Sequence, residues 1–258
     1  MNFIALTIFP EMFSVFSGYG IIRKAIEEKK IFVSAINIRD FARGKHRVTD
    51  DRPYGGGCGM VMKPEPLAGA IRAAKDKLPS AKTILLTPAG RVFNHNLAGE
   101  LGCCDGLILV CGRYEGVDER ICHNLIDFEV SLGDYVMTGG ELAAMVIIDA
   151  VARLIPGILG SADSAQKDSF SGGLLEHAQY TRPQNFEGDE VPEVLLSGHH
   201  KEIEKFRLET SLIRTFLKRK DLLEKRPLNN QEREILEKWC RDIKKIINFN
   251  HEHRTQTS

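Results

Sequence analysis

The sequence predicts an α/β protein with a mainly parallel sheet, followed by a smaller all-helical domain. Short apolar runs alternate with segments of helical period up to about Ile155. This alternation is typical of βαβ units, whose helices cover both faces of a parallel sheet. After a stretch rich in Ser, Gly and Asp, only helical periodicity remains. We therefore expect one domain at 1–159, a flexible linker at 160–173 and a second domain at 174–258.

The elements of the first domain follow from the period of their apolar residues. The expected strands are Phe3–Phe9, Ile31–Ile38, Thr83–Thr87, Leu107–Cys111 and Phe128–Val136. The expected helices between them are Met12–Lys30, Pro64–Leu78, Asn96–Cys104, Asp118–Ile126 and Glu141–Leu154. Because a helix can cross over between successive strands, the strands are expected to run mainly parallel.

The C-terminal part reads as two amphipathic helices. In the first helix, the expected apolar stripe consists of Ile203, Phe206, Ile213 and Leu217. Asn229, with Glu232 three residues later, forms a capping-box pattern that predicts the start of the last helix.

Basic residues gather at the C-terminal end of a chain whose net charge is zero. From Gly198 to Ser258 there are 15 Lys and Arg against 10 Asp and Glu. Arg207, Arg214 and Lys218 are spaced by seven and four residues, so they share one helical face opposite the expected stripe. This face either binds the phosphates of a polyanion or is an ordinary solvated surface.

Neither a membrane segment nor a secretory signal is expected. The longest apolar runs fall short of a membrane span, and the N-terminal residues lack a basic segment and a cleavage site. We expect a cytoplasmic protein without membrane contact. The six cysteines contain no Cys-x-x-Cys pair, which favours buried reduced thiols over a disulfide or metal site.

Two glycine-bearing loops follow buried strands in the middle of the chain. One is Cys111–Gly116 and the other is Ser131–Glu141. Ligands of α/β sheets bind beyond the carboxyl ends of the strands, where glycine allows close approach of backbone, so the two loops predict one shared pocket. A third glycine cluster, Tyr54–Gly59, lacks the Gly-Lys-Ser/Thr ending of a phosphate loop. The pocket therefore suits an adenosine-bearing ligand without a pyrophosphate.

Long motifs in the chain resemble those of one enzyme family. They are Thr7–Phe13, Asp50–Gly57, Cys111–Gly116, Ser131–Glu141 and Tyr180–Pro183. Together they are similar to the bacterial tRNA (guanine-N1)-methyltransferase family, TrmD, over nearly the whole chain. The resemblance implies the SPOUT class of folds, with a deep trefoil knot around S-adenosylmethionine. It also implies a homodimer that binds the tRNA anticodon stem-loop and makes 1-methylguanosine immediately 3′ of the anticodon.

The family's cofactor residues carry over to three loops. They correspond to Leu86, Thr87, Pro88, Gly112, Tyr114, Leu132, Gly133, Asp134, Tyr135, Val136, Met137, Gly139 and Gly140. Several of these glycines would serve tight turns as well as the cofactor. Relatives more usually carry Gln in place of His95, beside the first loop.

The reaction implied by the resemblance assigns three catalytic roles. Guanine N1 carries a proton at neutral pH, so its methylation requires a base, and Asp168 matches the family's catalytic aspartate. Negative charge then develops on O6, where Arg153 would stabilise it. Without the family, Asp168 would read as a turn residue and Arg153 as the partner of Asp149 in a helical salt bridge. Glu115 is a third candidate, linked to the Mg²⁺ associated with the family, although no carboxylate cluster marks a metal site and we assign no metal ligand.

Two other function classes fit parts of the sequence. A ribose 2′-O-methyltransferase of the same knotted class would share the cofactor site but must activate a hydroxyl group. An RNA-binding protein without activity would need only the basic C-terminal helix. The pairing of Asp168 with Arg153 favours chemistry on a base edge.

Overall fold

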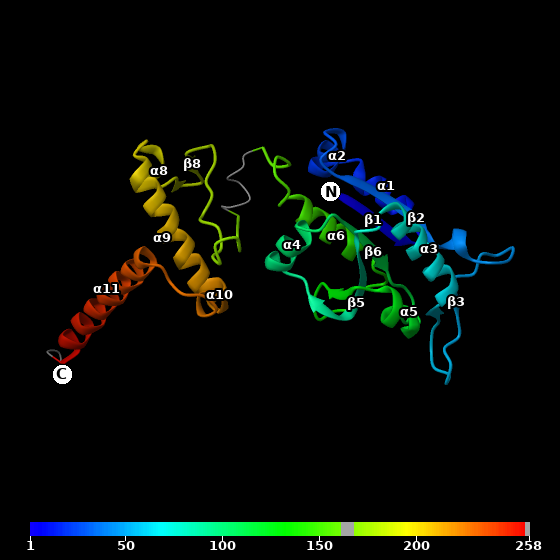
Figure 1. The fold of residues 1–258 in the computed structure, drawn as a ribbon. Coiled ribbons are helices and arrows are strands. Elements are labelled where there is room, and N and C mark those ends of the chain that lie inside the picture. The colour runs from blue at the N-terminus through cyan, green and yellow to red at the C-terminus, as the bar shows by residue number, and fades with distance from the viewer. Residues whose placement is uncertain (161–167, 256–258) are drawn as a thin grey trace. The chain divides into compact units, whose positions relative to one another are not determined.

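The computed structural model describes residues 1–160 and 168–255 (Figure 1). The chain divides into two compact units, Met1–Ala165 and Gln166–Ser258. Half of the expected linker, residues 161–167, lies outside the described residues. Within the described ranges, no helix is both long and apolar enough to cross a lipid bilayer.

A parallel five-stranded sheet forms the centre of the described part of the first unit. The strands are β1 (Asn2–Thr7), β2 (Phe32–Asn37), β5 (Lys82–Val92), β6 (Gly106–Cys111) and β7 (Phe128–Ser131), in the order β2-β1-β6-β5-β7. Every neighbouring pair is parallel. All six residues of β6 are buried, as their uninterrupted apolar run predicts for a central strand. The α/β class is confirmed, while the trefoil knot stays a prediction.

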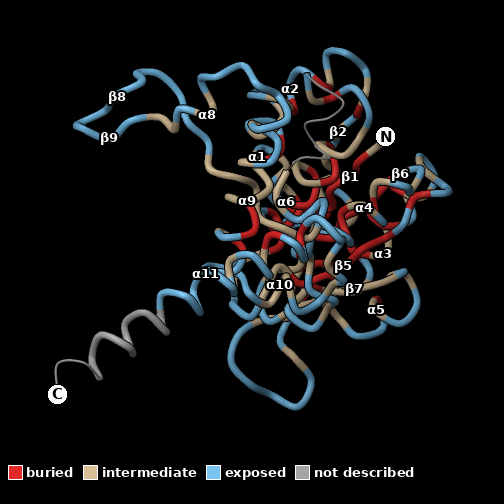
Figure 2. Tube along the Cα trace, turned by 90° about the vertical axis from the view of Figure 1, so that its left-hand side faces the viewer, coloured by how far each residue is buried: buried red, intermediate tan, exposed pale blue. Residues whose placement is uncertain are grey.

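Helices cover both faces of this sheet (Figure 1). One face packs against α1 (Glu11–Ser17), α2 (Gly20–Glu27), α4 (His95–Gly102) and α6 (Glu141–Ala152). The other packs against α3 (Pro64–Lys77), α5 (Glu119–Leu125) and the short η1 (Ile38–Phe41). Figure 2 shows the buried residues of the unit gathered around its central strands. The described part of the first unit thus has the three layers expected from the alternating sequence pattern.

Three local features of the first unit differ from the sequence prediction. The expected helix Met12–Lys30 breaks into α1 and α2, because Gly20 adopts a left-handed φ of 61° at the start of α2. Strand β5 continues to Val92 through a register shift in which Leu86 and Arg91 both pair with Val130. A small hairpin of β3 (Asp50–Asp51) and β4 (Val61–Met62) frames the glycine cluster and was too short to predict.

The second unit is mainly helical. Its helices are α8 (Glu193–Leu196), α9 (His200–Lys218), α10 (Lys220–Glu224) and α11 (Asn230–Thr255). It also contains a hairpin of β8 (Asn185–Phe186) and β9 (Asp189–Glu190), so the prediction of an all-helical domain was wrong at this point. The capping box of α11 is confirmed, since Asn229 Oδ1 accepts a hydrogen bond from Glu232 N–H at 2.9 Å and Glu232 Oε2 accepts one from Asn229 N–H at 3.0 Å.

The buried face of α9 is not the expected apolar stripe. Ile213 and Leu217 are 43% and 71% exposed, whereas Ser211, Leu212 and Thr215 are buried. The physical reason is that this helix packs against the backbone of Leu175, which requires polar partners. The hydrophobic pattern alone therefore placed the wrong side of the helix inside.

Candidate active site

A cavity of about 450 Å³ lies where β5, β6 and β7 end. Its wall is formed by the residues that follow Leu85 in β5, by the loop after Cys111 and by the loop from Ser131 to Gly140. This is the edge of a parallel sheet at which ligands bind, and the volume suits a nucleoside-sized ligand. The shared pocket predicted from the two glycine loops is present, with a third wall from β5.

The cavity collects nearly all of the expected cofactor residues that the structure describes. Those that line it are Leu86, Thr87, Pro88, Gly112, Tyr114, Leu132, Gly133, Tyr135, Val136, Met137, Gly139 and Gly140, together with the catalytic candidate Glu115. Asp134 belongs to the loop from Ser131 to Gly140, but it is exposed and does not line the described cavity.

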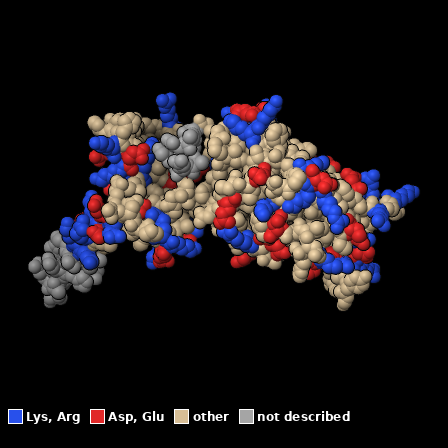
Figure 3. Space-filling view, viewed as in Figure 1, with Lys and Arg blue, Asp and Glu red and all other residues tan. Residues whose placement is uncertain are grey.

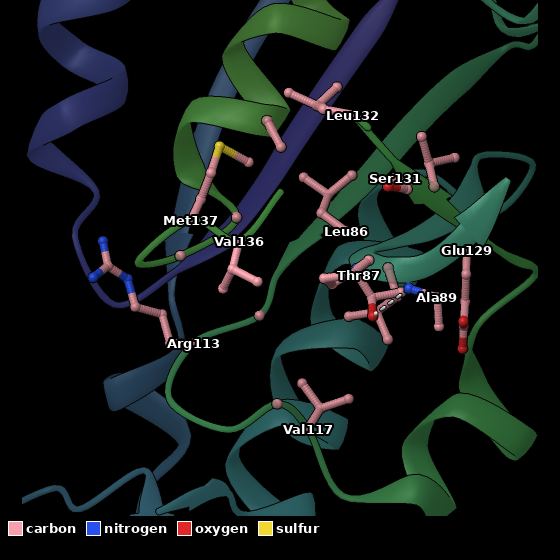
Figure 4. A pocket seen from close by; sticks show the side chains of 18 of the residues that line it. Leu86, Thr87, Ala89, Arg113, Val117, Glu129, Ser131, Leu132, Val136 and Met137 are labelled. Carbon is pink, nitrogen blue, oxygen red and sulfur yellow. Dashed lines mark hydrogen bonds between the residues drawn. The ribbon is translucent and has the colours of Figure 1, made fainter. Parts of the chain in front are cut away.

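Several wall residues were missed by the sequence interpretation. They include Ala89, Arg113, Val117, Glu129, Ser131 and Thr138. Arg113 and Thr138 stand inside the glycine loops and could have been found there, whereas Val117 and Glu129 reach the wall only through the fold. In Figure 4, Leu86, Val117 and Val136 present apolar side chains from three different segments, and the Arg113 guanidinium points away from Leu86 and Thr87.

Glycine is required where the loop after Cys111 meets the loop from Ser131 to Gly140. The Gly140 N–H donates to the Gly112 carbonyl oxygen at 2.9 Å. A Cβ atom on Gly140 would lie 2.8 Å from Cys111 Cα and 3.0 Å from Gly112 N, both of them backbone atoms. Since backbone cannot move aside as a flexible side chain can, no larger residue fits at position 140.

The loop from Ser131 to Gly140 is held by a local hydrogen-bond pattern. Ser131 Oγ accepts from the Gly133 N–H at 3.1 Å and donates to the Gly133 carbonyl oxygen at 3.2 Å. Gly133 has a φ of 147°, and its Cα faces the ring of Tyr135, to which a Cβ would approach within 2.9 Å. The loop therefore turns sharply beside the cavity and places Tyr135 against its own backbone.

A buried ion pair joins the loop after Cys111 to the start of α6. The Glu141 side chain is 1% exposed, and its Oε2 lies 3.0 Å from both Arg113 Nε and Arg113 Nη2. Glu141 Oε1 accepts a further hydrogen bond from Thr7 Oγ1 at 2.8 Å. The Arg113 guanidinium also lies over the ring of Phe9, 4.5 Å from its centroid. These contacts fasten the end of β1, the loop after β6 and the first turn of α6 to one another.

Glu115 is positioned by the glycine-rich hairpin. Its N–H donates to the Met60 carbonyl oxygen at 2.9 Å, and the following Gly116 carbonyl oxygen accepts from the Met62 N–H at 2.9 Å. A Cβ on Gly59 would come within 2.3 Å of Glu115 Oε1. Thus the Tyr54–Gly59 cluster, which is no phosphate loop, makes room for the Glu115 side chain beside the cavity.

Two thiols near the site are held neutral by their surroundings. Burial raises the pKa of Cys122 to about 11, and the neighbouring charges of Glu119 and Glu129 add to the effect. Burial also raises the pKa of Cys111 well above its usual range, with a contribution from the charge of Glu141. Neither thiol is therefore a nucleophile at neutral pH.

The other two catalytic candidates lie outside the wall of the described cavity. Arg153 follows the last residue of α6 and is half-buried, and its N–H donates to the Asp149 carbonyl oxygen at 3.2 Å. Asp168 belongs to the second unit, where it starts a turn and its carbonyl oxygen accepts from Ser171 Oγ at 2.7 Å. The first unit thus contains Glu115 and Arg153, and the second contains Asp168.

The expected RNA-binding residues all lie on α9. Lys218 is exposed, whereas Arg207 and Arg214 are half-buried and each buries its Nε atom. Arg207 Nη1 donates to Glu204 Oε1 at 3.0 Å. On the face drawn in Figure 3, Lys and Arg side chains are interspersed with Asp and Glu over both units. This face of both units therefore carries mixed charge rather than uniformly positive charge.

The described residues do not form a ready-made metal site. Among the side chains described in residues 1–160 and 168–246, no group of three or more from His, Cys, Asp and Glu is placed to hold a metal ion. Magnesium requires several oxygen ligands. Glu115, one of the carboxylates that line the cavity, packs against Gly59. No step of the reaction is therefore assigned to this ion.

Comparison with known proteins connects this geometry to a family. Residues 1–225 match the family model described as tRNA (Guanine-1)-methyltransferase TrmD. A tRNA (guanine-N(1)-)-methyltransferase of Desulfatibacillum aliphaticivorans is 55% identical over 247 residues, which make up 96% of this chain and 94% of that protein. One from Listeria innocua is 50% identical over 236 residues, or 91% and 96% of the two chains.

A solved structure agrees with these sequence matches. The crystal structure of tRNA (m1G37) methyltransferase from Aquifex aeolicus superposes with a TM-score of 0.71 at 40% identity and covers 87% of this chain and 95% of that one. The family model, the relatives and the solved structure each extend over most of the chain. The chain belongs to the TrmD family of tRNA (guanine-1)-methyltransferases.

Proposed function

We propose that the protein transfers a methyl group from S-adenosylmethionine to N1 of the guanosine immediately 3′ of the anticodon in tRNA. The observation that carries the proposal is the cavity at the ends of β5, β6 and β7, which is built from the loops that the family motifs predict. Relatives named tRNA (guanine-N(1)-)-methyltransferase are 50% to 55% identical to this chain over 87% to 96% of its length.

The cavity fits S-adenosylmethionine in size and in lining. Its volume of about 450 Å³ lies in the range of cofactor sites. Leu86, Val136 and Met137 offer apolar contact to an adenine ring, while Gly112 and Gly140 line the cavity without a side chain. Bound there, S-adenosylmethionine would supply an electrophilic methyl group.

The protein's own side chains supply the proton transfer and the charge stabilisation. Guanine N1 must lose its proton as it takes up the methyl group, and the Asp168 carboxylate accepts it. Negative charge that develops on O6 is stabilised by the Arg153 guanidinium. This interaction is stronger in the transition state than in the ground state, so it lowers the barrier. Glu115, beside the cavity, orients the guanine by accepting a hydrogen bond.

The second unit binds the substrate in this proposal. Arg207, Arg214 and Lys218 of α9 contact phosphates of the tRNA anticodon stem-loop, while the guanosine flips into the site. Base flipping is required because the guanine is otherwise stacked within the loop, where its N1 cannot reach the methyl group.

We further propose that the protein is a homodimer. Leu142 and Val146 lie one turn apart on α6 and are 55% and 46% exposed, although seven of the 12 residues of this mostly apolar helix are buried. Adjacent exposed apolar side chains on a helix of this kind suit a two-fold contact. Leu142→Asp combined with Val146→Asp should give monomers in analytical ultracentrifugation, and an unchanged dimer would exclude this face as the interface.

Transfer of labelled methyl to an unmodified tRNA transcript tests the proposed reaction. The transcript carries two guanosines at the 3′ boundary of the anticodon, and its product is digested to nucleosides. We expect 1-methylguanosine at that position. A 2′-O-methylated product would instead indicate ribose chemistry, and the absence of any transfer would overturn the proposal.

A further inference from the structure

We propose that Ser211 and Thr215 are positioning residues for Asp168, through which helix α9 carries the catalytic turn and the RNA contacts as one body. The inference rests on the proposed function and deepens it. It links two sites in the second unit that the sequence interpretation treated separately.

The first observation is a pair of hydroxyl groups that holds one peptide. The Leu175 N–H donates to Thr215 Oγ1 at 2.9 Å, and Ser211 Oγ donates to the Leu175 carbonyl oxygen at 2.5 Å. Ser211 and Thr215 are four residues apart, so both hydroxyls point from one side of α9. Together they satisfy both polar backbone groups of Leu175. Two bonds to one residue fix the position of this segment along the axis of α9 as well as its contact with the helix.

The second observation is that Leu175 is tied to Asp168 by short steps. The Glu176 N–H donates to Ser169 Oγ at 2.9 Å, and the Phe170 N–H donates to the Leu174 carbonyl oxygen at 2.8 Å. The Asp168 carbonyl oxygen accepts from Ser171 N–H and from Ser171 Oγ. The stretch 168–176 is therefore one hydrogen-bonded turn, and the peptide that α9 holds is close to its C-terminal end.

A third contact fastens the middle of the turn. The Arg219 guanidinium lies over the ring of Phe170 at 5.8 Å from its centroid. Gly173, with a φ of 72°, packs so closely on Arg226 that a Cβ would lie 2.5 Å from Arg226 Cδ. The turn thus touches the residues after α9 as well as α9 itself.

The anchors adjoin the proposed RNA contacts on the same helix. Arg214 is three residues from Ser211, and Lys218 is three residues from Thr215, which places each basic residue beside an anchor. Phosphates held by Arg214 and Lys218 would therefore fix the orientation of the Asp168 turn. The two hydroxyl groups that α9 buries are the partners of the Leu175 N–H and carbonyl oxygen, and apolar residues in their place would leave both backbone groups without these hydrogen bonds.

The test compares single-turnover methyl transfer by variants that lose the hydroxyls. We expect Ser211→Ala with Thr215→Val to lower the rate constant about tenfold to a hundredfold, because a misplaced base loses proximity. The dissociation constants of tRNA and S-adenosylmethionine should stay within about threefold, since neither ligand touches these hydroxyls. Hydrogen exchange of the Leu175 amide should become faster in the double variant.

A matched control is available on the same helix. Within the described residues, Thr210 Oγ1 donates to carbonyl oxygens of α9 itself, those of Phe206 and Arg207, so Thr210→Val should leave the rate constant unchanged. Thr215→Ser, which keeps the hydroxyl, should restore most of the rate lost in Thr215→Val. Should the double variant fail to unfold cooperatively, these single variants carry the same comparison.

The outcomes separate this inference from the proposed reaction. A wild-type chain that transfers no methyl group overturns both. An active wild type with an equally fast double variant overturns the positioning role alone. An equal loss in Thr210→Val, or a loss confined to tRNA affinity, would also overturn it, because it would show a general effect on α9.

Discussion

The carboxylate of Glu141, almost fully enclosed at the first turn of α6, pairs with the guanidinium of Arg113 from the neighbouring glycine loop at 3.0 Å. Thr7 donates to the same carboxylate from the end of β1. The ion pair therefore joins segments that are far apart in the sequence and fixes the spacing of two loops around the cavity. A buried charge of this kind is costly to leave unpaired.

Loss of the Glu141 charge should destabilise the fold. Glu141→Gln keeps the shape but weakens the bond to Arg113, and we expect the free energy of unfolding in urea to fall by about 2 kcal/mol. The control is Glu100→Gln, which removes an Arg–Glu pair with Arg91 whose two side chains are each 55% exposed. That change should lower the free energy of unfolding far less, because water and salt screen an exposed pair. Equal effects of the two substitutions would contradict a special role for the buried pair.

Substitution of Gly140 should distort the proposed cofactor site. In Gly140→Ala the new methyl group meets Cys111 Cα and Gly112 N, so the loops must separate. We expect S-adenosylmethionine affinity, measured by calorimetry, to fall at least about tenfold. Gly99→Ala in α4, where no atom lies within 4 Å of the new Cβ, should leave the affinity unchanged and stabilise the helix by about 0.5 kcal/mol. Wild-type affinity in Gly140→Ala would show that the loops are not held this closely.

Removal of the base should stop the reaction and spare the cofactor. Asp168→Ala is expected to lose detectable turnover, while the dissociation constant of S-adenosylmethionine stays within about tenfold of the wild type. Single-turnover assays and calorimetry measure the two quantities on the same preparation. Full activity of the variant would remove Asp168 from the role of general base.

The salt dependence of tRNA binding tests Arg214. Loss of one phosphate contact should reduce the slope of log affinity against log salt concentration by about 1. Arg214→Ala should therefore weaken binding more at low salt than at high salt. Glu209→Gln on the same helix serves as a control that removes a charge without removing a cation. An unchanged slope in Arg214→Ala would place this side chain away from the phosphates.

The cavity thiol should resist alkylation at mild pH. With a pKa of about 11, only about one in a thousand Cys122 thiols is ionised at pH 8, so iodoacetamide should label exposed Cys58 far faster. Labelling of Cys122 should accelerate as the pH approaches 11. Folding holds this thiol neutral, so its contribution to stability is complete below about pH 8.5 and is lost as the pH rises through about 11. Peptide mass mapping measures each site, and rapid labelling of Cys122 at pH 8 would contradict the raised pKa.

Hydrophobic period predicted the elements of the first unit well, because each strand and helix there carries its own pattern. The run Leu107–Cys111 lies within β6, and Pro64–Leu78 differs from α3 by one residue. The break at Gly20 and the extension of β5 to Val92 were not predictable, since both depend on local backbone geometry and pairing with a distant strand. In α9 the pattern misled, because the buried partner of the helix is a polar backbone segment.

The sequence by itself determined the class of fold, the family and the loops that surround the cavity, because strand ends, glycines and long motifs are local features of the chain. Only the tertiary structure decided that Glu141 pairs with Arg113 and that Ser211 and Thr215 hold Leu175. These contacts join residues separated by 28 to 40 positions, and no local periodicity records them. Their strength comes from burial, which removes competing water and is a property of the folded chain as a whole.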